Sequence, residues 1–129
     1  MTKQYDHIKK IWFVDGDRKF YMRSKWEFNY ACYLNFLLKH GEILSWEHEP
    51  DTFWFEKIRR GVRSYLPDFK VVNKSGSIEY HEVKGYMDPK SKTKIKRMAK
   101  YYPEVKLVVI DQKAYNAIKK IKGMIKGWI

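Results

Sequence analysis

The residues with the clearest chemical potential are two carboxylates and one lysine, Asp68, Glu82 and Lys84, within the stretch 65–86. Carboxylate oxygens are hard ligands that suit Mg²⁺ or Mn²⁺, and these ions can also take water and phosphate oxygens. Such an ion acidifies a bound water and neutralises charge on a phosphate, while a nearby lysine can hold the water or stabilise the transition state. The combination predicts metal-dependent phosphodiester hydrolysis. The alternative is a solvated Glu–Lys pair on a surface hairpin, which is worth little free energy.

A β-hairpin would bring these side chains together. Runs of β-branched and aromatic residues precede and follow the turn-forming cluster Asn-Lys-Ser-Gly at 73–76, which is typical of two strands joined by a short turn. With the turn on the middle two residues, the register places Asp68 opposite His81 and beside Glu82. A shift of one residue would still leave Asp68 near Glu82. Alternation along the second strand puts Glu82 and Lys84 on one face.

From about residue 23 to residue 111 the chain resembles the PD-(D/E)xK nuclease superfamily. The two signature pieces of that superfamily correspond to Pro67-Asp68 and to Glu82-Val83-Lys84-Gly85. Within it, the chain is most similar to phage-type endonuclease I, a family of Holliday-junction resolvases. The further similar features are a Ser-x-x-Glu helix start at Ser24–Glu27, Trp46-Glu47-His48-Glu49, Tyr65-Leu66 and Phe69 around the Pro-Asp pair, and Tyr102-Pro103-Glu104 before a last strand.

The resemblance implies a divalent-metal-dependent, structure-selective DNA endonuclease, with a four-way junction as its substrate. Asp68, Glu82 and Glu27 would ligate Mg²⁺ or Mn²⁺. The backbone carbonyl of Val83 would complete the ligand set, and Lys84 would assist the attacking water. The products would carry 5′-phosphate and 3′-hydroxyl ends.

Two alternatives to a resolvase remain. One is another DNA nuclease of the superfamily, of the replication, packaging or transposase type. The other is a non-catalytic basic module that binds DNA and uses its carboxylates structurally. The set of Asp68, Glu82 and Lys84 argues against the second alternative, because a binding module has no use for acidic groups that face DNA.

The third carboxylate has two candidate sources. Ser24 followed three residues later by Glu27 forms a capping box at a helix start, so Glu27 has a structural explanation that requires no metal. The resemblance implies that this first-turn glutamate also reaches the metal site. The rivals are Glu47 and Glu49, which lie two residues apart on one face of a strand predicted at 43–49.

The net charge of +12 over 129 residues points to a polyanionic partner, with nucleic acid before a membrane surface. One group of cations precedes Asp68 and consists of Lys57, Arg59, Arg60 and Arg63. A second group lies on the outer face of a helix predicted at 89–102 and consists of Lys90, Lys92, Lys94, Lys96, Arg97 and Lys100. The helix dipole disfavours cations in first turns, and a bound phosphate would offset that penalty. This helix is therefore the strongest candidate for DNA contact, and recognition of backbone shape is expected.

The order of the predicted elements indicates an α/β fold with a central mixed sheet flanked by helices. The resemblance implies that this is a restriction-endonuclease-like core, in which a helix, three strands, a helix and a strand follow one another. The length fits one domain. Its expected parts are a basic N-terminal β-hairpin at 9–23, a nuclease core at 24–111 and a C-terminal helix and tail at 112–129. The apolar run 105–110 predicts a strand buried on both faces.

Location and assembly follow from a few further features. A single cysteine, Cys32, excludes an internal disulfide, and with no signal peptide or membrane-spanning run this favours the cytoplasm, that of the host if the chain is phage-encoded. Residues 1–10 are polar and are expected to be loosely held. Two symmetric cuts at a junction imply a homodimer. Its interface candidates, either of which could instead cover the monomer's own core, are the hairpin aromatics Trp12, Phe13, Phe20 and Tyr21 and the tail 124–129.

Overall fold

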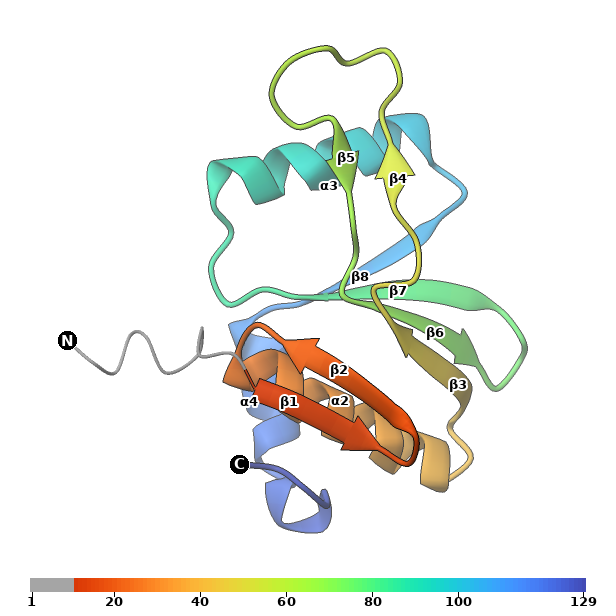
Figure 1. The fold of residues 1–129 in the computed structure, drawn as a ribbon, viewed down its shortest axis with the longest axis vertical. Helices are drawn as coiled ribbons and strands as arrows, with labels where there is room; N and C mark the ends of the chain where they lie inside the picture. Colours follow the sequence, from red (N-terminus) through yellow and green to blue (C-terminus); the bar gives the residue numbers. More distant parts are fainter. Residues whose placement is uncertain (1–10) are drawn as a thin grey trace, which may run out of the picture.

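A four-stranded mixed sheet forms the centre of the computed structural model, which describes residues 11–129 (Figure 1). The strands follow the order β3-β6-β7-β8, and their bounds are Ile43–His48, Phe69–Asn73, Ile78–Val83 and Lys106–Ile110. Strands β3 and β7 are both antiparallel to β6, and β8 runs parallel to β7. The expected mixed α/β architecture is therefore confirmed, and what was expected of residues 1–10 lies outside the described residues.

Three α-helices accompany the sheet in the described part of the chain: α2 (Lys25–Lys39), α3 (Pro89–Tyr101) and α4 (Gln112–Lys119). Helix α2 begins where Ser24 Oγ accepts a hydrogen bond from the amide of Glu27, and it ends before Gly41, whose positive φ of 72° permits the chain reversal. Figure 1 shows α2 and α4 on one side of the sheet and α3 on the other.

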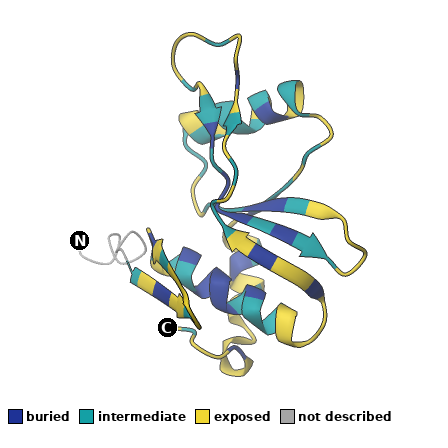
Figure 2. Cartoon of the chain, turned by 45° about the vertical axis from the view of Figure 1, so that its right-hand side comes forward, coloured by how far each residue is buried: buried dark blue, intermediate teal, exposed yellow. Residues whose placement is uncertain are grey.

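The main core lies between α2 and the sheet. Tyr30 and Leu34 of α2 pack over Trp46 and Phe69 of the sheet, and all four are buried. Figure 2 shows this concentration of buried positions in α2 and in the central strands, with exposed residues at the turns. Burial of apolar surface at about 25 cal/mol per Å² is the main force that holds such a helix against a sheet.

An N-terminal β-hairpin, as expected from the sequence, packs against this core. Strands β1 (Ile11–Asp15) and β2 (Arg18–Met22) are joined by a turn in which Gly16 has a φ of 59°. Phe13 and Met22 are buried against the core. The hairpin thus brings Arg23, the next residue, to the start of α2.

A second, smaller core supports α3. Strands β4 (Phe53–Trp54) and β5 (Ser64–Tyr65) form a two-stranded arm that stands above the sheet beside α3 (Figure 1). Phe55, Tyr65 and Met98 form the buried centre of this cluster. Each strand of the arm has only two residues.

The register of the β6–β7 hairpin differs by one from that expected. The carbonyl of Asn73 accepts a hydrogen bond from the amide of Gly76, and the amide of Asn73 donates one to the carbonyl of Ser77. The loop therefore has three residues, and Phe69, not Asp68, faces His81. A three-residue loop is favoured because Gly76 adopts a left-handed φ of 89°. Asp68, one residue earlier, therefore comes to lie beside Glu82.

The expectation that the strand at 105–110 is buried on both faces was wrong. Strand β8 is only half-buried along most of its length, because its edge position leaves it with one sheet neighbour. Helix α4 ends at Lys119 and a 3₁₀ turn follows at Lys122–Met124, so Ile121 leaves the helical face and is exposed. No helix within residues 11–129 is both long and apolar enough to cross a membrane.

Candidate active-site cleft

One cleft of about 860 Å³ gathers the residues that the sequence singled out. Its walls come from the start of α2, the segment before β6, the end of β7 and the start of α3. The residues predicted to be catalytic or metal-ligating all line it: Glu27, Asp68, Glu82, Val83 and Lys84. These residues are separated by up to 57 positions in sequence, so the fold brings them together.

Asp68 and Glu82 are each held through one carboxylate oxygen. Oδ2 of Asp68 accepts the backbone amide of Val83 at 2.8 Å. Oε1 of Glu82 accepts the hydroxyl of Tyr65 at 2.8 Å and the amide of Asp68 at 3.2 Å. These bonds fix both carboxylates and leave the second oxygen of each for a ligand.

The surroundings disfavour negative charge on this pair. Burial is the largest cause that raises the pKa of Asp68 well above its usual range, and the nearby charges of Glu82 and Glu27 add to it. Burial likewise raises the pKa of Glu82, against the opposing effect of the Tyr65 hydroxyl. A cation placed between the two carboxylates would favour their charged forms.

Lys84 is positioned by the start of α3. Its Nζ lies 3.8 Å from Oδ2 of Asp88. The other carboxylate oxygen of Asp88 accepts the amide of Ser91 at 2.7 Å and so caps the helix. Because the amide of Lys84 also donates to the carbonyl of Ile110, both its backbone and its side chain are anchored beside the cleft.

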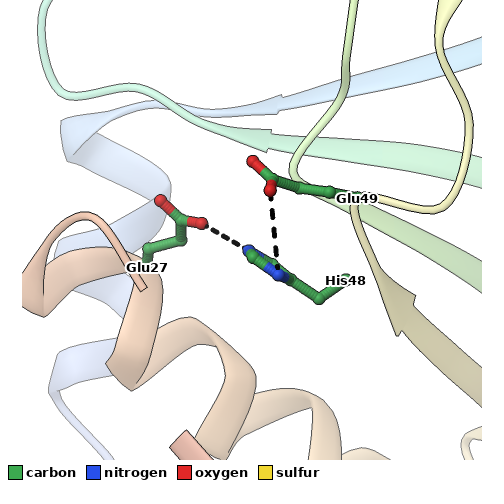
Figure 3. A group of neighbouring side chains, drawn as sticks. All are labelled: Glu27, His48 and Glu49. Atoms are coloured by element: carbon green, nitrogen blue, oxygen red, sulfur yellow. Dashed lines mark hydrogen bonds and ion pairs between the residues drawn. The ribbon is translucent and has the colours of Figure 1, made fainter. Parts of the chain in front are cut away.

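The Glu27 carboxylate contacts His48, a residue that was not predicted from the sequence to belong to the site. Its Oε2 lies 2.8 Å from Nε2 of His48, and Nδ1 of His48 lies 4.0 Å from Oε1 of Glu49 (Figure 3). Of the capping box, the hydrogen bond from the Glu27 amide to Ser24 Oγ is present, whereas the Glu27 carboxylate contacts His48. Alternation along β3 places His48 on the same face as the buried Trp46. That alternation could have indicated that His48 faces the core, although not that it contacts Glu27.

Glu47 and Glu49 do not share a strand face, so this expectation was wrong. Glu47 is exposed and pairs with Lys70 in the register of β3 and β6. Strand β3 ends at His48, and Glu49 has a φ of 49°, which turns its side chain out of the strand pattern. The amide of Glu49 donates to the carbonyl of Asp68 at 2.9 Å.

Arg23 also belongs to this region. Its guanidinium pairs with the carboxylate of Glu49, and the residue lines the cleft. Of the two rival carboxylates, only Glu49 therefore approaches the site.

The predicted DNA-binding residues fall into different environments. Lys90, Lys92 and Lys96 are exposed on α3, and Lys94 lines the cleft. Three arginines are exposed in the segment between β4 and β5: Arg59, Arg60 and Arg63. Arg97 differs because its guanidinium donates to the carbonyl of Val62. Arg97 thus holds the arm against α3, and the view of it as a free phosphate contact is not supported.

His81, which precedes Glu82 on β7, is not among the residues that line the cleft. Its Nδ1 is 2.6 Å from the hydroxyl of Tyr30, and its Nε2 is 2.7 Å from Oε1 of Glu79. Burial lowers the pKa of His81. The residue therefore serves the packing of α2 on the sheet.

The chain belongs to the DUF1064 family, which is described as a protein of unknown function, and the family model matches residues 2–119. Among curated proteins and among solved structures, none is similar enough to the chain to count as a match.

Proposed function

We propose that the cleft is the active site of a divalent-metal-dependent DNA endonuclease, of the kind that resolves four-way junctions. The observation that carries the proposal is the convergence of Glu27, Asp68, Glu82 and Lys84 on one cleft. Acidic metal ligands beside a lysine are suited to phosphodiester hydrolysis.

The charge balance of the region supports a divalent cation. Five carboxylates face three cationic side chains, which leaves an excess of two negative charges when all of them are ionised and His48 is neutral. The carboxylates are Glu27, Glu49, Asp68, Glu82 and Asp88, and the cations are Arg23, Lys84 and Lys94. Such an excess, partly buried within a protein of net charge +12, is costly unless a cation binds. The oxygen donors fit Mg²⁺ or Mn²⁺.

Each residue would then have a distinct role. Asp68 and Glu82 would hold the ion through their unengaged oxygens, together with Glu27 and the carbonyl of Val83. The bound ion would acidify water and neutralise charge on the phosphate. The Lys84 ammonium, anchored near Asp88, would orient the attacking water.

The arrangement of elements is compatible with a restriction-endonuclease-like core. Leaving out the β4–β5 arm, the chain order is α2, β3, β6, β7, α3 and β8. The cleft lies where β7 ends and α3 begins. This order agrees with what the sequence resemblance implies, and it supports the assignment of Asp68 and Glu82 as the central pair.

Two basic surfaces suit a DNA backbone near the cleft. The exposed lysines of α3 lie beside Lys94, which lines the cleft, and the exposed arginines of the β4–β5 arm extend the positive surface. Contacts of this kind neutralise phosphates without reading bases. They favour recognition of DNA shape, as a branched substrate requires.

A cleavage panel tests the proposal. Four-way junction, flap, single-stranded and linear duplex DNA are incubated with Mg²⁺, with Mn²⁺ or with EDTA. We expect metal-dependent cleavage of the junction, and Asp68→Asn should abolish it while DNA binding persists. Preferential cleavage of flap or duplex DNA would instead indicate another nuclease of the superfamily. Tight binding with no cleavage of any substrate would indicate a binding module and overturn the proposal.

A further inference from the structure

Glu27 also belongs to a second group of side chains whose types could ligate a metal ion. Ligand atoms of Glu27, His48 and Glu49 all lie within 4.8 Å of one another (Figure 3). The three residues come from the first turn of α2 and from the end of β3. In octahedral coordination at about 2.2 Å, ligand atoms lie roughly 3–4.4 Å apart, so only small movements are needed.

The imidazole distinguishes this set from Asp68 and Glu82. Mg²⁺ prefers oxygen ligands, whereas imidazole nitrogen suits transition metals and Zn²⁺. The site chemistry is therefore one nitrogen and two carboxylates, to which an ion such as Mn²⁺ or Zn²⁺ is suited.

We propose that His48, Glu27 and Glu49 bind a second divalent cation, of the transition-metal class, with Mn²⁺ or Zn²⁺ favoured over Mg²⁺. Ligation through Nε2 requires the neutral tautomer that carries its proton on Nδ1. The rings of Phe20 and Phe69 flank the imidazole, which limits its rotation and keeps Nε2 directed toward Glu27.

Burial and charge support the assignment. The side chains of His48 and Glu27 are each only 6 % exposed, and two carboxylates so close to one imidazole repel one another. The Arg23 guanidinium, which pairs with the Glu49 carboxylate, partly offsets this charge. A divalent ion would replace that pairing and release Arg23 toward the cleft that it lines.

This site adjoins the proposed catalytic one. Glu27 both lines the cleft and contacts His48, and the amide of Glu49 is bonded to the carbonyl of Asp68. The inference rests on the proposed function only in sharing Glu27. It deepens that function by making the identity of the metal a regulator: Mn²⁺ would fill both sites, whereas Mg²⁺ would fill the carboxylate site alone.

Electron spin-echo spectroscopy of the Mn²⁺-loaded protein, without DNA and without a histidine tag, tests the inference. We expect ¹⁴N modulation from a directly bound imidazole, and ¹⁵N-histidine labelling should change it. His48→Gln should remove the modulation and weaken the binding of one Mn²⁺ by about tenfold or more. His40→Gln, a matched change at an exposed position, should leave both unchanged.

The outcomes separate this inference from the nuclease proposal. No nitrogen modulation in the wild type, or modulation that persists in His48→Gln, overturns the second site even if DNA is cleaved. Modulation that depends on His48 supports the site even if no DNA substrate is cut. Because the wild-type spectrum alone decides the first outcome, the test holds even if His48→Gln does not fold.

Discussion

The hydroxyl of Tyr65 donates a 2.8 Å hydrogen bond to Oε1 of Glu82. Tyr65 is buried in the small core beneath α3, so this bond ties the carboxylate to that core. The burial of Tyr65 and the charge of Glu82 both raise the pKa of the hydroxyl, which therefore stays a donor. Tyr65 is thus a positioning residue for Glu82.

Tyr65→Phe is expected to reduce cleavage about 10–100-fold, as loss of a partner that orients a metal ligand does. The metal concentration needed for half-maximal rate should rise at the same time, because Glu82 is less well fixed. Tyr102→Phe is the matched control, since the Tyr102 hydroxyl bonds to the carbonyl of Trp54 and does not contact Glu82. Equal effects of the two changes would mean that Tyr65 acts only through stability.

Asp68→Asn is expected to stabilise the metal-free protein while abolishing activity. Because the folded state raises the pKa of Asp68, it binds this proton more tightly than the unfolded chain does. The stability associated with that proton is complete below the ordinary aspartate pKa of about 3.9, and it is lost as the pH rises through the raised value. At neutral pH the variant should therefore melt above the wild type.

Melting curves at several pH values, with and without Mg²⁺, check this prediction. The gap between Asp68→Asn and wild type should shrink as the pH falls, and Mg²⁺ should stabilise the wild type alone. The exposed Asp17 gives the control Asp17→Asn, which should melt like the wild type at each pH and, because it retains Asp68, should be stabilised by Mg²⁺ to the same extent. A variant less stable than wild type at neutral pH without metal would contradict the account of Asp68.

Glu27→Gln distinguishes the role of residue 27 in capping α2 from its proposed role as a metal ligand. The bond between Ser24 and residue 27 uses the backbone amide, so the variant should melt near wild type. Its cleavage should fall by about 100-fold or more, since a charged metal ligand is lost. Glu47→Gln changes an exposed carboxylate on β3 and should leave cleavage unchanged. Full activity of Glu27→Gln would transfer the role of third carboxylate to Glu49.

Local sequence signals were sufficient to predict that Asp68 and Glu82 lie close together. Turn residues at 73–76 and a period of two indicated the hairpin, and an error of one in the register still left the two carboxylates adjacent. The error arose because Gly76 at positive φ accommodates a three-residue loop, which residue types alone do not distinguish from a two-residue one.

Contacts between distant segments could not be derived in the same way. The bond between Glu27 and His48 depends on how α2 lies across β3, and that between Arg97 and Val62 depends on how the arm lies on α3. Neither pair has a spacing that periodicity could detect. Glu49 was mistaken for a strand residue because a positive φ at a glutamate has no sequence signature.

The exposed lysines of α3 should carry part of the affinity for DNA. Replacing Lys90, Lys92 and Lys96 with glutamine should weaken binding to all junction sequences alike. Each lost phosphate contact should lower the magnitude of the log–log salt slope by about 0.9. The same change at three exposed C-terminal lysines gives a control of equal charge: Lys119, Lys120 and Lys122. An altered sequence preference at an unchanged slope would mean that the α3 lysines do not contact phosphates.

Paired cleavage of a junction requires two active sites, so we expect a homodimer. Of the two interface candidates, the tail largely covers the monomer's own core. Ile125 is buried, and the ring centroid of Trp128 lies 5.4 Å from that of Tyr115. The amide of Ile129 donates a hydrogen bond to Oδ1 of Asn29. The N-terminal hairpin remains the better candidate. Its outward face presents Trp12 and Val14, which are 50 % and 66 % exposed.

Light scattering at micromolar concentration should find the wild type as a dimer. The double variant Trp12→Glu/Val14→Glu should be a monomer. Two buried charges in an interface are costly, whereas the fold should persist because Phe13 and Met22 supply the hairpin's buried face. The dissociated variant should nick a junction without cutting it symmetrically. Leu44→Glu, at a position 57 % exposed elsewhere on the surface, should remain dimeric. A wild-type protein that stays monomeric even on a four-way junction would exclude paired resolution and favour a nuclease that acts on flaps or single strands.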